Sequence, residues 1–249
     1  TVDSSTFVVA ALDYAYQNGA LVVASAADEN SFHHNLPGTN NHTLYVHAVR
    51  QDTNEPQNAT TFLNFNNCTN YGAQLQLSAP GESCSSKATG TTSGMAGLVY
   101  SYALERGLAP SLSAEEARQL LVMTADDIYV PESATDPTKY PSKPGWDQRF
   151  GYGRNNIRTA LDWVGAGRIP PEVDVTSPTW FQMIPARGTA TGATFDVTGR
   201  VAARRASSFD YTIEVACGVE PEAADFTTLA AETNRTAPLG PILAASVTL

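Results

Sequence analysis

Two adjacent histidines and a nearby carboxylate are the first residues that could do chemistry. Glu29, His33 and His34 lie close together in a polar stretch, and His47 follows in an apolar one. Imidazole and carboxylate groups are zinc ligands, but neighbouring histidines in a loop are weak evidence for a zinc site. We therefore predict no metal site here, and we interpret these histidines as loop and strand residues without a catalytic role.

The cysteines offer a second kind of chemistry. Cys68 and Cys84 are sixteen positions apart in Ser- and Asn-rich sequence, and Cys217 lies far downstream. An odd number of cysteines is compatible with one disulfide, between Cys68 and Cys84, and equally with three free thiols. The sequence leaves both alternatives open.

Alternating helices and strands must position these residues. Short apolar or alternating runs predict strands at 20–27, 44–49 and 74–79. Helical patterns with caps or glycine stops predict helices at 3–18, 94–106 and 114–125, and a further short helix that ends near 164. The strongest signal is the capping box formed by Ser113 and Glu116. This order of elements predicts an α/β domain with a parallel sheet.

A change of composition near residue 170 predicts a second domain. The segment 165–178 is rich in Gly and Pro, so we place one domain at 1–168, a linker at 169–178 and a β-rich domain at 179–249. Alternating strands are predicted at 194–201 and 209–216. A complete β-sandwich needs about 100 residues, so we expect the start of a sandwich that is truncated at its C-terminus.

Composition excludes two classes of partner. The net charge is -10 and only 16% of residues are charged, which argues against nucleic acid and anionic membranes as partners. Apolar runs such as 20–27 are too short to span a bilayer. A surface of uncharged polar residues favours a secreted or cell-surface protein, and we expect any leader to have been removed or left out.

Several motifs, in their order, resemble the C-terminal half of subtilisin-like serine peptidases. They are Ala26-Ala27-Asp28-Glu29 after a buried strand, Ala79-Pro80-Gly81 after a later strand, and Met95-Ala96-Gly97 in a helix. The resemblance covers residues 3–164. It implies a subtilisin-like three-layer α/β domain that hydrolyses peptide bonds in polypeptide substrates. Calcium commonly stabilises this family, but no Asp/Asn ligand run is evident, so no cofactor is predicted.

The resemblance also assigns candidate site residues. An ungapped comparison places Thr89 at the position of the nucleophilic Ser, and a shift of four positions places Ser93 there. The alternative is that both are ordinary helix-capping hydroxyls. Asp28 stands where the family has an Asn that stabilises the oxyanion. An ionised carboxylate would repel an oxyanion, whereas a protonated one could donate to it, as in the similar, acid-active sedolisins. Asp28 could equally be a carboxylate that binds nearby N–H groups.

The remaining catalytic residues of the family are absent from these 249 residues. Motifs similar to those that carry its catalytic Asp and His are expected in a missing upstream half of the domain. Two function hypotheses follow: part of a serine endopeptidase, or a catalytically inactive pseudopeptidase that acts as a binding or structural module. A third assigns binding of a carbohydrate or protein to the β segment after residue 178.

Overall fold

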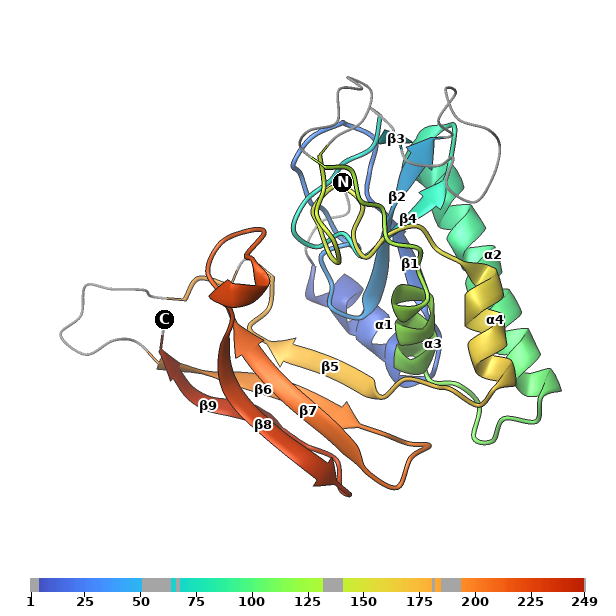
Figure 1. The fold of residues 1–249 in the computed structure, drawn as a ribbon. Helices are drawn as coiled ribbons and strands as arrows, with labels where there is room; N and C mark the ends of the chain where they lie inside the picture. Colours follow the sequence, from blue (N-terminus) through green and yellow to red (C-terminus); the bar gives the residue numbers. More distant parts are fainter. Residues whose placement is uncertain are drawn as a thin grey trace. The chain divides into compact units, whose positions relative to one another are not determined.

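The computed structural model describes residues 5–50, 64–65, 68–131, 141–180, 182–184 and 194–248. The chain separates into two compact units, residues 1–169 and residues 170–249. The first is mixed α/β and the second is built from antiparallel strands (Figure 1). The predicted fold class, an α/β domain with a parallel sheet followed by β structure, is confirmed.

Strand β2 is the centre of the sheet in the first unit. Val46 of β2 is in register with Ser25 of β1 and with Leu77 of β4, and both pairings are parallel. The strands of this sheet are β1 (Val22–Ser25), β2 (Thr43–Arg50), β3 (Asn64–Phe65) and β4 (Leu77–Pro80). Because β1, β2 and β4 run in the same direction, their carboxyl ends lie at one edge of the sheet.

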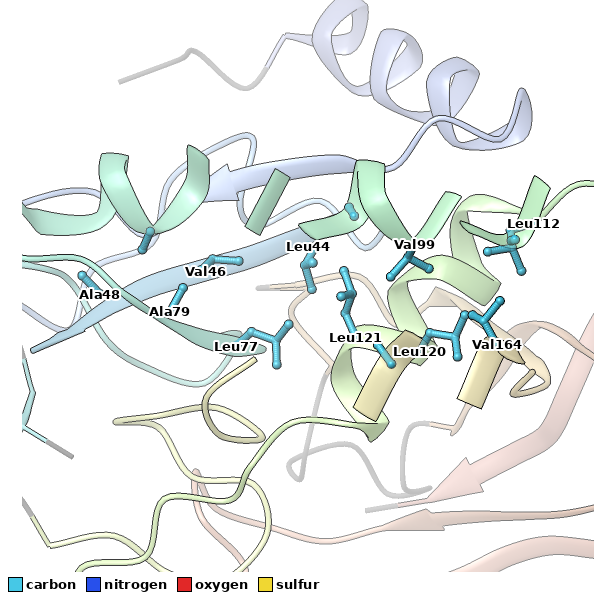
Figure 2. Close-up of a cluster of buried hydrophobic side chains, with 14 residues drawn as sticks. Leu44, Val46, Ala48, Leu77, Ala79, Val99, Leu112, Leu120, Leu121 and Val164 are labelled. Atoms are coloured by element: carbon cyan, nitrogen blue, oxygen red, sulfur yellow. The ribbon is translucent and has the colours of Figure 1, made fainter. Parts of the chain in front are cut away.

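Helices cover one face of this sheet. They are α2 (Cys84–Glu105), α3 (Ala114–Met123) and α4 (Ile157–Gly165), and α1 (Thr6–Gln17) precedes β1. Alternate residues of β2, Leu44, Val46 and Ala48, pack with apolar residues of α2, α3 and α4 in one buried cluster (Figure 2). The intervening residues of β2 point to the opposite face, where Tyr45 and Val49 belong to separate buried clusters. Burial on both faces explains why the sequence of β2 is apolar almost throughout.

The predicted helix boundaries hold for α1 and α3 and fail for α2. Ser5 caps α1, where its Oγ accepts from the N–H of Val8 at 3.3 Å. The capping box of α3 is formed by Ser113 and Glu116 as predicted.

Helix α2 begins at Cys84, ten residues before the start predicted near Gly94. The added segment is rich in Ser, Thr and Gly, which are weak helix formers. Packing stabilises it, because residues at helical spacing, Ala88, Thr92 and Ala96, are buried while Gly90 and Gly94 are exposed. Tertiary contacts therefore override the local propensity.

A buried carboxylate links α1 to α3. Glu115 is 2% exposed and accepts from the Tyr16 hydroxyl of α1 at 3.0 Å. It also accepts from Arg118 Nε at 2.9 Å and from Gln119 Nε2 at 2.7 Å. Arg118 in turn donates to the carbonyl of Asn41 at 2.8 Å. This network fixes the start of α3 against α1 and the loop before β2.

One glycine is required by a close approach of two backbone segments. Gly153 has φ 114°, and a Cβ there would collide with backbone atoms of Asp126 and Asp127. Next to it, Arg154 and Asp126 exchange backbone hydrogen bonds of 2.8 and 2.7 Å. The segment that precedes α4 can approach Asp126 this closely only with glycine at position 153.

We expect Gly153→Ala to lower the free energy of unfolding by at least about 2 kcal/mol, since it adds a backbone clash to the cost of a positive φ. The matched control is Gly145→Ala, because Gly145 also has a positive φ, 80°, but open space around its Cβ position. That control should cost about 1 kcal/mol. Urea unfolding of both variants measures the two free energies of unfolding. Equal losses of stability would contradict a backbone clash at position 153.

The second unit contains more strands than the sequence predicted. Strands β6 (Thr194–Ala202) and β7 (Phe209–Val215) were expected, whereas β8 (Thr227–Arg235) and β9 (Ile242–Thr248) were not. Together with β5 (Glu172–Ser177), these strands form a three-stranded sheet in the order β5-β6-β9 and a two-stranded sheet of β7 and β8.

Part of the predicted linker is also a strand. Residues Glu172–Ser177 form β5, which pairs antiparallel with β6. The placement of a linker over all of 169–178 was therefore wrong. The sequence Glu-Val-Asp-Val-Thr-Ser alternates, and only its flanking prolines suggested an extended connection.

No described helix is both long and apolar enough to cross a bilayer.

Candidate active site

Two segments that follow parallel strands meet at the carboxyl edge of the sheet. Asp28 follows β1, and Ser85 lies in the first turn of α2, which follows β4. Connections at this edge of parallel sheets are the usual place for binding and catalytic residues. Asp28 and Ser85, fifty-seven positions apart in the sequence, are in direct contact there.

Ser85 has both of its polar groups engaged. Its backbone N–H donates to Asp28 Oδ1 at 3.0 Å, and its hydroxyl makes a short hydrogen bond to the same oxygen. The hydroxyl also lies 3.1 Å from the carbonyl oxygen of Ala27 and 2.5 Å from Ser25 Oγ. Because the single hydroxyl proton of Ser85 is donated to Asp28, the Ser25 hydroxyl donates to Ser85 Oγ. Ser25 Oγ also accepts from the N–H of Ala27 at 3.2 Å. Ser85 is completely buried, whereas Asp28 is exposed.

Asp28 takes the place of a capping residue for α2. The N-cap residue Ser83 makes no side-chain capping bond, and the carboxylate of Asp28, in the loop after β1, accepts from the N–H of Ser85 in its place. A negative charge is favourable at the positive end of a helix dipole. Of the two roles considered for Asp28, acceptance of N–H groups is the one seen here, and its role as an oxyanion donor stays a prediction.

Thr89 and Ser93 lie inside α2 and not at its N-terminus. The Thr89 hydroxyl donates to the carbonyl oxygen of Ser85 at 2.9 Å, and the Ser93 hydroxyl donates to that of Thr89 at 2.9 Å. Such bonds to the preceding turn are ordinary for Ser and Thr within helices. Thr89, from the ungapped comparison, and Ser93, from the comparison shifted by four positions, stay predictions for the nucleophile.

Ser85 was not predicted as a site residue. The comparison was anchored on Met95-Ala96-Gly97, and the helix was expected to start near Gly94. The helix begins ten residues before Gly94, almost three turns earlier than expected, and its first turn places Ser85 beside Asp28. The available signal was the serine cluster of residues 83, 85 and 86, which is typical of a helix start.

Asn70 organises the loop that follows Asp28. Its side chain is almost fully buried. Its Oδ1 accepts from the N–H of Glu29 at 2.9 Å and from that of Ser31 at 3.4 Å. Its Nδ2 donates to Glu29 Oε2 at 3.3 Å and to the His33 carbonyl at 3.2 Å. All four hydrogen-bonding positions of this amide are therefore used within residues 29–33.

Glu29 and the histidines surround this loop. Glu29 forms a short contact with His33 Nδ1, and this bond, with the one from Asn70, lowers the pKa of Glu29. Burial lowers the pKa of His34, and the charge of His33 lowers it further. Among the described residues, no three His, Cys, Asp or Glu side chains lie close enough to hold a metal ion.

Cys68 and Cys84 form a disulfide, and Cys217 is a free, exposed thiol. Of the two alternatives that the sequence left open, the disulfide is therefore present and three free thiols are not. Cys84 is the first residue of α2 and directly precedes Ser85, with a left-handed φ of 51°. The disulfide therefore connects the segment that carries Asn70 to the start of the helix that carries Ser85.

The chain belongs to the subtilase family, whose family model, Peptidase_S8, matches residues 1–153. The predicted family is thereby confirmed. A search of curated proteins gave no match.

Solved structures of proteases share the fold. The chain is similar to the psychrophilic subtilisin-like protease Apa1 from the Antarctic psychrotroph Pseudoalteromonas sp. AS-11, with 15% identity and a TM-score of 0.50 over 68% of this chain and 70% of that one. It is also similar to the prenylagaramide maturation protease PagA, with 21% identity and a TM-score of 0.49 over 65% of this chain and 56% of that one. Sphericase is similar with 22% identity and a TM-score of 0.47, over 63% of this chain and 54% of that one. The chain thus spans little more than half of the PagA structure.

Proposed function

We propose that this chain is part of an exported subtilisin-like serine endopeptidase and that Ser85 is its nucleophile. The observation that carries the proposal is the contact between Ser85, in the first turn of α2, and Asp28, at the end of β1. A hydroxyl at the N-terminus of a helix lies where backbone N–H groups can stabilise a developing oxyanion. Ser85 has this placement, whereas Thr89 lies one turn further along.

Asp28 gives the proposed reaction an acidic pH dependence. While ionised, its carboxylate accepts from the N–H of Ser85 and so occupies the donor that an oxyanion would need. Once protonated, it can give up that bond and donate its own proton toward the oxyanion. The hydroxyl proton of Ser85 must pass to a base supplied by another polypeptide segment. Peptide-bond cleavage is therefore expected at acidic pH and not at neutral pH.

A second candidate function is that of a pseudopeptidase. It is favoured by the complete burial of Ser85 and by the engagement of both its amide and its hydroxyl. In that case the Asp28–Ser85 contact is a structural cap and the chain acts as a binding or structural module.

Labelling with a fluorophosphonate distinguishes the two candidates. The protein, made with its upstream sequence, is treated at pH 4 and at pH 7, and the modified residue is located by mass spectrometry. We expect labelling of Ser85 at pH 4 only, and loss of labelling in Ser85→Ala. Ser86→Ala is the matched control, because Ser86 is an exposed neighbouring hydroxyl that should not matter. Asp28→Asn, which places an amide donor in the site, should permit labelling at pH 7.

Other outcomes are equally informative. Labelling at Thr89 or Ser93 would support the ungapped or the shifted assignment and contradict Ser85. A folded protein that is not labelled at either pH would favour the pseudopeptidase.

We also propose that a further polypeptide segment, an upstream part of the same domain, completes the first unit. Among the described strands, β1 pairs only with β2, which leaves its other edge open. Helix α1 is apolar yet has no buried residue, and Phe7 and Tyr14 are 81% and 69% exposed. Binding of a hydrophobic dye to the isolated chain should fall when the upstream sequence is present, and unchanged binding would contradict this partner.

The disulfide is consistent with an exported protein, because disulfides persist in oxidising compartments.

A further inference from the structure

We propose that the Cys68–Cys84 disulfide is a redox-sensitive clamp that holds Ser85 closed against Asp28, so that reduction releases the start of α2. The inference rests on the proposed function in treating Ser85 as the reactive residue. The clamp itself is defined by contacts that do not depend on catalysis.

The first part of the clamp is the pairing of two loops. Residues 68–72 run beside residues 27–33, where the N–H of Asn70 donates to the carbonyl of Ala27 at 3.0 Å and that of Tyr71 to the carbonyl of Ser31 at 3.2 Å. The four side-chain hydrogen bonds of Asn70 add to this pairing. The loop that carries Asp28 is therefore fixed to the segment that begins at Cys68.

The second part is the covalent link from that segment to α2. Cys84 is joined to Cys68, and the next residue, Ser85, donates two hydrogen bonds to Asp28. The start of α2 is thus connected twice to the loop that carries Asp28. One connection is the direct hydrogen bonding of Ser85 to Asp28, and the other runs through the disulfide and the segment that carries Asn70. If the disulfide is broken, only hydrogen bonds and the packing of the buried Ser85 hold the first turn of α2.

Three features make this link suited to release. Both cysteines are partly exposed, so a small reductant can reach them. Cys84 has φ 51°, a left-handed conformation that is unfavourable for a residue other than glycine. The disulfide and the hydrogen bonds of Ser85 to Asp28 maintain this conformation. The first turn of α2 has no cap of its own from Ser83. Without the disulfide, this turn is expected to open locally while the buried middle of α2 stays helical.

The chemistry is a two-electron exchange with a dithiol. The dithiol supplies two electrons and two protons, the bond between Cys68 and Cys84 breaks to give two thiols, and the dithiol becomes a disulfide. Release of the first turn then exposes Ser85, which is completely buried in the oxidised form.

Hydrogen–deuterium exchange tests the clamp without requiring activity. The full chain is compared before and after treatment with dithiothreitol at pH 7, and Cys68→Ser provides the same state genetically. We expect amide exchange at 27–33 and 84–89 to accelerate on the order of ten- to 100-fold on reduction, while α3 (114–123) remains protected. Cys217→Ser is the matched control, since this free thiol should leave both peptides unchanged.

Two results would overturn the proposal. Unchanged exchange at 84–89 after complete reduction would show that the disulfide does not hold Ser85. Accelerated exchange throughout residues 5–131 would show a general stabilising disulfide and not a local clamp.

Fluorophosphonate labelling at pH 4 separates this proposal from the proposed function. Opening seen by exchange without any labelling would leave the clamp standing and contradict the peptidase. Labelling that is equally fast in oxidised and reduced protein would leave the peptidase standing and contradict the clamp.

Discussion

Glu115→Ala is expected to lower the free energy of unfolding by about 3 to 5 kcal/mol, because it removes one partner of a buried ion pair. Glu115 is 2% exposed and Arg118 has a side chain that is 12% exposed. Without the carboxylate, the guanidinium, the Tyr16 hydroxyl and the Gln119 amide all lose a buried acceptor. Chemical denaturation at pH 7, followed by circular dichroism, measures the loss.

A surface ion pair in the same unit provides the control. Arg158 and Asp162 are 3.6 Å apart on α4, and their side chains are 87% and 69% exposed. Asp162→Ala should change the free energy of unfolding by no more than about 0.5 kcal/mol. If Glu115→Ala cost as little as this control, the network between α1 and α3 would be unimportant for stability.

The second large effect is a loss of stability in acid that originates at His47. Its side chain is completely buried on the face of β2 opposite to α2, with its ring 6.1 Å from that of Phe150. Burial lowers the pKa of His47 to about 3, and the charge of Arg149 acts in the same direction, whereas a hydrogen bond with the backbone of Asn70 opposes it. The folded protein therefore keeps this imidazole neutral.

The sign of the effect follows from this pKa. The unfolded chain binds a proton below about pH 6.5 and the folded chain only below about pH 3, so stability falls as the pH falls through that window. Between pH 7 and pH 5, the contribution of His47 should fall by about 2 kcal/mol.

The comparison that isolates this contribution is between the natural protein and His47→Gln. The variant has no titrating group at position 47, and its other histidines are shared with the natural protein, so its free energy of unfolding should fall by about 2 kcal/mol less between pH 7 and pH 5. Carboxylates titrate mainly below this range and contribute equally to both proteins. Parallel pH profiles for the two proteins would contradict a neutral, buried His47.

Sequence patterns were sufficient where local signals and burial agree. The capping box at Ser113 and Glu116 marked the start of α3, and the apolar run around Val46 marked the central strand. These elements have a local signature that does not depend on distant residues.

The start of α2 had no such signature. Its first three turns consist of weak helix formers, and what stabilises them is packing of Ala88 and Thr92 and the contacts of Ser85 with Asp28. Neither contact can be inferred from the segment itself, so the helix was predicted too short. The short predicted helix also left Ser85 outside the segment that was searched for site residues.

Strand β8 of the second unit was missed for a different reason. Residues of β8 such as Glu232 and Asn234 are exposed and polar, so this strand lacks the alternation of a half-buried one. Strand β8 pairs with β7 through backbone hydrogen bonds in an antiparallel register. The pattern of its side chains does not predict this pairing.

The Asp28–Ser85 contact also bears on how this chain could evolve. The carboxylate of Asp28 accepts from the first turn of α2, whereas the proposed peptidase reaction needs a proton donor at the same place. A substitution that improves one role weakens the other, since a single side chain cannot accept from the amide of Ser85 and leave that amide available to a substrate. Selection for a rigid helix start and selection for turnover at neutral pH therefore act on Asp28 in opposite directions.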